Sequence, residues 1–424
     1  MAVANDLSTH LNSPAHRRQQ PLRGAGIRCN QFVYRVIEPS QVSAWRAIVQ
    51  KGIIGRLVDQ GSIVDTTLLE NQTGPMLQQA ALAVESSPHE WCAAMLRDAA
   101  RTLLSCCIQL ARRGYTLNRI DAGIVQFDGP RAVVADLTSL SPVGEETTWL
   151  GYPEFAARFL HPLAMMVHGH DATARRHLAT GGVSGEMLRH HVPLRAIPPS
   201  LRAQWRSQSK LAKMARPISR WMRGAAPIDI ESNKRRRNTV VRKLERAREE
   251  LEEFAPGNAM IADRQLPLVD TELAKVVESL RPGRILLWGS GSPINGFDSI
   301  LCHTQPKEAD RWYGIAQTHR LPLVPLVMDL SQPLPQSGKP AEERLRSELM
   351  ITQADEGLLS PLPSTLNAHV DWLTKWTNRW LLVQLPHEWP SAPAGLAAAL
   401  QRQFTGVVTL SKNAHKGPLL VCEK

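Results

Sequence analysis

The sequence predicts an α/β protein with a mainly parallel sheet at the C-terminus, preceded by a smaller α+β domain and a helical, basic linker region. Three observations lead to this prediction. After residue 270, apolar strand-like runs alternate with helical patterns, which is typical of a parallel sheet. Before residue 145, short strands accompany one long amphipathic helix, and the segment between the two parts is rich in Arg, His and Pro. The predicted boundaries are a disordered lead-in at 1–26, the α+β domain at 27–150, the linker region at 151–255 and the sheet domain at 256–424.

The composition is that of a protein with two or three ordinary cores, since 43% of the 424 residues are hydrophobic. No apolar run approaches the ~20 residues needed to cross a bilayer. The N-terminus has no apolar stretch typical of a secretory signal, and its Pro, Gln, Arg and Ser content predicts disorder. The six cysteines are scattered without C-x-x-C spacing, which indicates free thiols and a cytoplasmic protein.

The positive charge is concentrated in one segment. Residues 195–250 hold 16 Lys or Arg against five Asp or Glu, a balance that equals the net charge of +11 of the whole chain. Such a segment could bind nucleic acid, an anionic surface or an acidic partner. The alternative is a solvated connector helix, because charge runs usually mark exposed faces.

The N-terminal elements follow from local patterns. Alternation of apolar and polar residues predicts a strand at 32–36, and helical spacing predicts a helix at 44–61 that ends at Gly61. A second strand is expected at 64–70. The strongest helix pattern covers 88–113, and Asp128-Gly129 joins two short strands as a hairpin turn.

The remaining elements are mostly helices, and then helices and strands in alternation. Residues 150–225 read as helices interrupted by prolines, and a long charged helix follows at about 232–254. Helices are then expected at 270–280, 306–319, 365–378 and 393–403, and strands at 284–288, 322–328, 348–352, 380–385, 406–411 and 418–422.

A glycine-rich turn follows the strand at 284–288. The stretch RILLWGSGSPINGFDSIL at 284–301 delivers an apolar strand into Gly289, Gly291 and Gly296. This is how a Rossmann-like domain brings backbone N–H groups against a nucleotide. The motif lacks the acidic residues that normally bind the ribose of the cofactor.

Three stretches together resemble a bacterial two-part family, exemplified by NoeA-like nodulation proteins. They are SPHEWCAAMLRDAARTLL at 87–104, LNRIDAGIVQFDGPRAVVADLTSL at 117–140 and LPLVPLVMDLSQPLP at 321–335. Members of this family carry a kinase-like N-terminal region and a class I S-adenosylmethionine (SAM) methyltransferase domain. The resemblance runs over about 30–424 and implies transfer of a methyl group to a small molecule or glycoconjugate.

The kinase-like resemblance places unsuitable residues at the catalytic positions. Arg119 stands where the catalytic Asp would be, Ile124 stands where a metal-binding Asn would be, and only Asp136 matches the second Asp. In a shifted alignment Asp121 could replace the missing base. Because phosphoryl transfer depends on placed metal ions, we expect a pseudokinase-like lobe without kinase activity.

The methyltransferase resemblance implies a degenerate cofactor site. Gly289, Ser290, Gly291 and Gly296 correspond to the glycine loop, but Trp288 replaces its strand Asp. His303 or Gln305 stands where an acidic residue would bind the ribose, whereas Asp329 matches the residue that contacts adenine. Each missing hydrogen bond to a charged group contributes about 1.5–3 kcal/mol. SAM is therefore expected to bind weakly unless Ser290, Ser292, His303 or Gln305 compensates.

Two functions remain open from the sequence. One is an active SAM-dependent methyltransferase. The other is an inactive pseudoenzyme that supports a partner, for which Trp372, Trp376 and Trp380 suggest an interaction surface, because they recur at i, i+4 spacing. Histidines at 168–171 and 190–191 are not expected to bind metal, because i, i+2 residues of a helix point to different faces.

Overall fold

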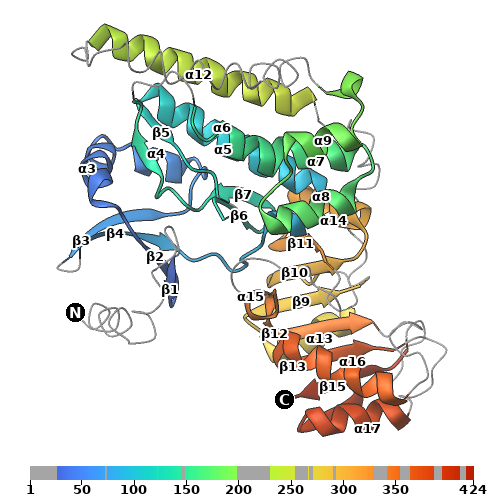
Figure 1. The fold of residues 1–424 in the computed structure, drawn as a ribbon. Coiled ribbons are helices and arrows are strands. Elements are labelled where there is room, and N and C mark those ends of the chain that lie inside the picture. The colour runs from blue at the N-terminus through green and yellow to red at the C-terminus, as the bar shows by residue number, and fades with distance from the viewer. Residues whose placement is uncertain are drawn as a thin grey trace.

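The computed structural model describes most of the chain, in segments that together form an α+β part and a sheet part (Figure 1). The described residues are 26–71, 74–121, 123–144, 149–197, 230–253, 266, 271–289, 293–328, 341–353, 363–385, 394–410 and 417–424. Among them, no helix combines the length and apolar character needed to cross a membrane.

The N-terminal part begins with a four-stranded antiparallel sheet in the order β1-β2-β4-β3. Its strands are β1 (Ile27–Cys29), β2 (Phe32–Val36), β3 (Thr66–Asn71) and β4 (Gly74–Ala80). The single helix predicted at 44–61 is wrong: the chain forms α3 (Val42–Gln50) and α4 (Ile53–Asp59) instead. Gly52 separates them because its φ of +63° is a left-handed conformation that interrupts a right-handed helix.

The helix α5 (Ala93–Arg112) is the centre of the N-terminal core, and 11 of its residues are buried. The hairpin β6 (Val125–Asp128) and β7 (Arg131–Val134) packs against it, as the Asp128-Gly129 turn predicted. A second strand pair, β5 (Tyr115–Leu117) and β8 (Leu140–Pro142), precedes the helices of this part. Those helices are α6 (Tyr152–Phe155), a π-helical turn (Ala156–Leu160), α7 (His161–Val167), α8 (Asp171–Thr180) and α9 (Gly185–His191).

The helix α12 (Ile230–Glu253) packs along α5 and is not a solvated connector. Its apolar stripe of Val240, Leu244, Ala247 and Leu251 is buried in the same core. Spacings of three and four residues put these side chains on one face of the helix, which explains the burial. Of the basic segment 195–250, residues 198–229 lie outside the described part of the chain.

The C-terminal part is a seven-stranded sheet in the order β11-β10-β9-β12-β13-β15-β14. Five neighbouring strands run parallel, and β15 is antiparallel to both of its neighbours. The mainly parallel sheet is thus confirmed. The strands are β9 (Arg284–Trp288), β10 (Asp298–His303), β11 (Leu323–Val327), β12 (Ser347–Gln353), β13 (Thr377–Gln384), β14 (Gly406–Leu410) and β15 (Leu419–Glu423).

Helices cover both faces of this sheet. One face packs against α13 (Thr271–Leu280) and one side of α14 (Pro306–His319). The other face packs against α15 (Ala341–Leu345), α16 (Pro363–Trp376) and α17 (Ala394–Gln403). This is the doubly wound arrangement expected from alternating strands and helices.

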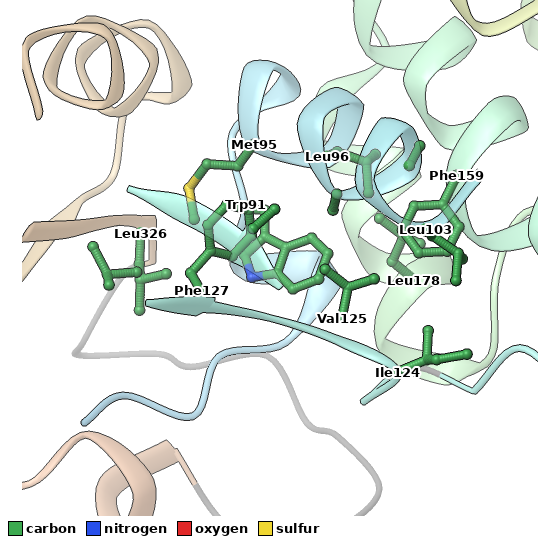
Figure 2. Packing of buried hydrophobic residues seen from close by; sticks show 14 of the residues in the cluster. Trp91, Met95, Leu96, Leu103, Ile124, Val125, Phe127, Phe159, Leu178 and Leu326 are labelled. Atoms are coloured by element: carbon green, nitrogen blue, oxygen red, sulfur yellow. The ribbon is translucent and has the colours of Figure 1, made fainter. Parts of the chain in front are cut away.

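The two parts share one continuous hydrophobic core. Trp91, beside α5, and Phe127, on β6, pack towards Leu326 of the sheet (Figure 2). Asp310 of α14 accepts a hydrogen bond from the backbone N–H of Ala94 at 3.0 Å, so a carboxylate of the sheet part caps the N-terminus of α5. The described parts are therefore packed as one body at this junction.

The buried His161 predicts a loss of stability in acid. Its ring nitrogen Nδ1 lies 2.8 Å from the carbonyl oxygen of Val183, and burial lowers the pKa of His161 below the ordinary 6.5. As the pH falls below about 6.5, the unfolded chain takes up a proton that the folded ring takes up only at lower pH. The free energy of unfolding therefore falls with falling pH. We expect urea midpoints measured from pH 7.5 to 5.5 to fall less in His161→Gln than in the unmodified protein, and equal slopes would contradict this role.

Candidate functional site

The candidate site lies at the carboxyl ends of β9 and β10. In a doubly wound sheet, ligands bind where the strand order reverses. That reversal is at β9, because the chain first adds β10 and β11 on one side of β9 and then adds β12 on the other. Trp288, Gly289 and His303 lie at these strand ends. The fold thus brings the predicted loop and the predicted ribose-binding position together.

Gly289 and Gly296 have backbone conformations that require glycine. Their φ angles are +90° and +87°, and no heavy atom of the described neighbouring residues lies within 4 Å of where a Cβ would stand. The N–H of Gly289 donates to the carbonyl of Cys302 at 3.4 Å, which holds the turn against β10. Both glycines therefore shape a turn beside open space.

Four predicted residues lie outside the described part of the chain. These are Ser290, Gly291, Ser292 and Asp329. Their contacts with a cofactor stay predictions.

The connection from β9 to β10 is too short to hold a helix. Only nine residues, 289–297, separate the two adjacent parallel strands. Such crossovers usually need about a dozen or more residues and contain a helix. The described part, 293–297, is non-helical, and Ile294 and Phe297 pack into the sheet core. The described residues of this connection consequently provide no helix N-terminus of the kind that binds pyrophosphate in dinucleotide-binding domains.

His303 offers a polar atom that the described residues leave without a partner. Its Nε2 atom is buried, and none of the described residues forms a hydrogen bond with it. Burial lowers the pKa of His303, and the charge of Glu308 partly offsets this effect. The ring is therefore neutral at pH 7, and Nε2 can donate to or accept from a hydroxyl group. The other candidate, Gln305, is exposed at the residue before α14.

Trp288 has an aromatic partner that the sequence alone did not reveal. Its ring meets that of Trp372 on α16 edge to face, with centroids 4.7 Å apart, and Trp372 meets Trp376 at 6.4 Å. Trp288 and Trp372 are half-buried, whereas Trp376 is fully buried. An aromatic cluster of Trp288, Trp372 and Trp376 therefore lies at the end of β9. The family resemblance implies a carboxylate at the position of Trp288.

The three tryptophans predicted as one interaction surface do not share an exposed face. Trp376 lies in the core on one face of the sheet. Trp380 has an exposed fraction of 6%, belongs to β13 and packs into the core on the opposite face. The i, i+4 spacing does not apply because the helix ends at Trp376 and side chains alternate along the strand that follows.

The polar residues at the positions aligned with a kinase site form ion pairs within the chain. Asp136 accepts hydrogen bonds from the backbone N–H and hydroxyl of Thr138, at 2.8 and 2.6 Å, and pairs with Arg35 at 3.4 Å. Arg119 pairs with Asp121 at 2.6 Å, and Ile124 is buried. The retained carboxylate of Asp136 is therefore bound by side chains and backbone of this chain.

The structure brings together two histidines that are distant in sequence. The rings of His170 and His191 lie edge to face, with centroids 5.0 Å apart. The described residues contain no group of three or more His, Cys, Asp or Glu side chains positioned to hold a metal ion.

The fold defines an α/β protein with a doubly wound sheet and places the candidate site at its switch point. No protein-family profile matches the chain. Over 121 residues it is 31% identical to nodulation protein NoeA of Rhizobium meliloti (strain 1021), a match that covers 27% of this chain and 25% of NoeA. The chain thus matches about a quarter of the length of that relative.

Several solved methyltransferase structures resemble the chain at low identity. Magnesium protoporphyrin IX methyltransferase from Synechocystis PCC 6803, with bound SAM, is 12% identical, with a TM-score of 0.26 and coverage of 49% of this chain and 91% of that one. An rRNA methylase from Escherichia coli is 15% identical, with a TM-score of 0.26 and coverage of 54% and 94%. TrmN from Thermus thermophilus is 17% identical, with a TM-score of 0.27 and coverage of 36% and 48%.

Proposed function

We propose that this chain is a SAM-dependent methyltransferase-like protein with a degenerate cofactor site, acting on a small molecule or glycoconjugate. The proposal rests on the arrangement of Gly289 and His303 at the switch point of the sheet. There, Gly289 in a left-handed conformation lies beside β10. That strand ends at His303, whose Nε2 atom has no hydrogen-bond partner among the described residues. The short connection leaves no helix for a pyrophosphate, which favours a phosphate-free adenosyl compound over a dinucleotide.

In this proposal, each predicted site residue binds a different part of SAM. Gly289, Ser290, Gly291 and Gly296 form the loop, His303 binds a ribose hydroxyl, and Asp329 contacts adenine. Bound SAM supplies an electrophilic methyl group. The protein then has mainly to position the acceptor. The rings of Trp288 and Trp372 suit the positive charge of a sulfonium group, because aromatic faces attract cations.

The affinity for SAM is expected to be modest. Two carboxylate contacts are replaced, at Trp288 and His303, and each contributes about 1.5–3 kcal/mol. Each 1.4 kcal/mol corresponds to about tenfold in affinity. We therefore expect dissociation constants from high micromolar to millimolar.

Replacing His303 by alanine is expected to weaken SAM binding up to about tenfold, because a neutral hydrogen bond contributes about 0.5–1.5 kcal/mol. Calorimetric titration with SAM and with S-adenosylhomocysteine measures the change. The same titration with NAD is expected to give weaker binding, because the pyrophosphate lacks a helix N-terminus.

The matched control is His319→Ala, which removes an exposed histidine at the end of α14 and should leave the affinity unchanged. Equal affinities of the His303→Ala and unmodified proteins would place the ribose elsewhere. Tighter binding of NAD than of SAM would overturn the choice of cofactor.

The second candidate is an inactive pseudoenzyme that serves as a scaffold or partner of another enzyme. It is favoured by the N-terminal cluster, where Asp136 is bound internally and a buried Ile124 stands at a position for metal binding. In this proposal the kinase-like lobe is used for packing, and kinase activity is absent. The absence of heat with millimolar SAM would support this function over the first.

A further inference from the structure

A basic groove lies between α5 and α12, on the side of the N-terminal part away from the C-terminal sheet (Figure 1). Its volume is about 560 Å³. Half of the residues that line it are arginines, and the full set is Ser105, Ile108, Gln109, Arg112, Arg113 and Arg248. The groove lies apart from the crevice at β9 and β10 and is not part of the proposed cofactor site.

The groove is a fixed feature because both helices are held together on their inner faces. Ion pairs fasten α12 to α5, between Arg112 and Glu245 at 3.0 Å and between Arg101 and Glu252. Glu250 is buried and accepts a hydrogen bond from the hydroxyl of Tyr152 at 2.8 Å. Three of the five glutamates in 244–253 thus bind other residues of the N-terminal part, whereas Glu249 and Glu253 are exposed.

The basic residues of α12 are concentrated in its N-terminal half, and the acidic residues in its C-terminal half. Residues 234–243 contain six Lys or Arg and no acidic residue, whereas residues 244–253 contain five Glu and two Arg. This order opposes the helix dipole, which favours acidic residues at the N-terminal end and basic residues at the C-terminal end. Helix stability therefore does not explain the positive charge. The exposed cations of the helix are Lys234, Arg235, Arg242, Lys243, Arg246 and Arg248.

The chemistry of this surface selects among anionic partners. A helix that binds a membrane surface buries an apolar face in the lipid, but the apolar face of α12 is already buried against α5. An acidic peptide would need an apolar or aromatic anchor pocket for affinity, whereas Ile108 is the single apolar side chain among the described residues that line the groove. Arginine predominates, and its planar fork matches phosphate oxygens in pairs.

We propose that the groove and the exposed basic side of α12 bind the phosphate backbone of a double-stranded nucleic acid. The described residues that line the groove include no aromatic side chain on which single-stranded bases could stack. From Lys234 to Arg248 the helix extends about 21 Å, at about 1.5 Å per residue. This length corresponds to about six base pairs of duplex, at about 3.4 Å each. Contacts restricted to phosphates give affinity with little sequence preference.

The proposal is tested by fluorescence anisotropy with a labelled 20-base-pair duplex of arbitrary sequence, as DNA and as RNA, from about 50 to 200 mM salt. The groove variant is Arg113→Gln/Arg248→Gln, which retains the Arg112–Glu245 ion pair. Losing two phosphate contacts should reduce the slope of log affinity against log salt by about two. It should also weaken binding about tenfold or more at low salt.

The matched control is Arg176→Gln/Arg189→Gln, which removes the same charge from exposed positions on α8 and α9. It should leave the salt slope unchanged, and thermal melts of both variants verify that they are folded. Binding of only the DNA or only the RNA duplex would support the proposal and identify the source of the phosphates. Equal salt slopes for the two variants would overturn it. Binding to phosphatidylserine vesicles without binding to either duplex would overturn it as well.

Discussion

Replacing Trp91 by alanine is expected to lower the free energy of unfolding by about 3–5 kcal/mol, the cost of removing a large buried aromatic side chain. Trp91 is fully buried where the two parts of the molecule meet. Its ring meets Phe127 edge to face at 5.1 Å, and Phe127 meets Tyr313 of α14 at 6.0 Å. The indole N–H donates to the hydroxyl of Ser86 at 2.8 Å. The substitution therefore removes the packing around this ring (Figure 2) and also a buried hydrogen bond.

Urea denaturation followed by far-ultraviolet circular dichroism measures this loss. Trp91→Phe retains most of the packing but not the N–H donor, and it should lose less stability. Trp288→Ala removes a half-buried tryptophan for comparison. It should lose less stability than Trp91→Ala, since part of the Trp288 ring already contacts solvent. A Trp91→Ala protein as stable as Trp288→Ala would show that this aromatic contact does not join the two parts.

Replacing Arg344 by methionine is expected to cost about 3–5 kcal/mol, because a buried ion pair loses one partner. Arg344 of α15 contacts both carboxylate oxygens of Glu90, at 2.5 and 3.3 Å, and the two side chains have exposed fractions of 7% and 1%. Methionine is similar in length but leaves the carboxylate of Glu90 buried without its cation. The same guanidinium donates to the carbonyl of Glu85, so the variant also loses a contact with the segment before α5.

The double variant Glu90→Gln/Arg344→Met removes the unpaired charge and should recover part of the loss. The control is Arg46→Met, at the exposed ion pair with Glu70, which should leave the urea midpoint unchanged. If Arg344→Met unfolds in the same transition as the unmodified protein, the ion pair does not couple the sheet to the N-terminal part. A biphasic transition in Arg344→Met would show the two parts unfolding separately.

The sequence analysis missed several elements, among them β10 and β4. The strand β4 was not predicted because Gln78 and Gln79 obscure its apolar alternation. Gln79 has an exposed fraction of 1%, since it accepts a hydrogen bond from Arg35 and donates one to Thr66. Only the neighbouring strands show that a polar side chain at this position is satisfied.

For the candidate site, the sequence located the strand ends but not their surroundings. Gly289 was predicted to follow a strand because a glycine after an apolar run is a local signal, whereas His303, at the end of β10, was assigned by the family resemblance. The aromatic contact of Trp288 with Trp372 depends on how α16 packs on the sheet. No local pattern encodes that packing.

The sequence by itself determined most of the alternating helices and strands of the C-terminal part, the turn at Asp128-Gly129 and a long charged helix at about 232–254, whereas β10 and α15 were not predicted. Periodicity of apolar residues is a property of neighbouring positions, so it survives without knowledge of the fold. Tertiary structure decided which surface covers each apolar face. It packed α12 on α5 and separated Trp376 from Trp380 onto opposite faces of the sheet. It also placed Asp310 at the N-terminus of α5, where its carboxylate accepts a backbone hydrogen bond. The sequence shows that an apolar helix face or a terminal N–H group needs a partner, but it does not show which residue that partner is.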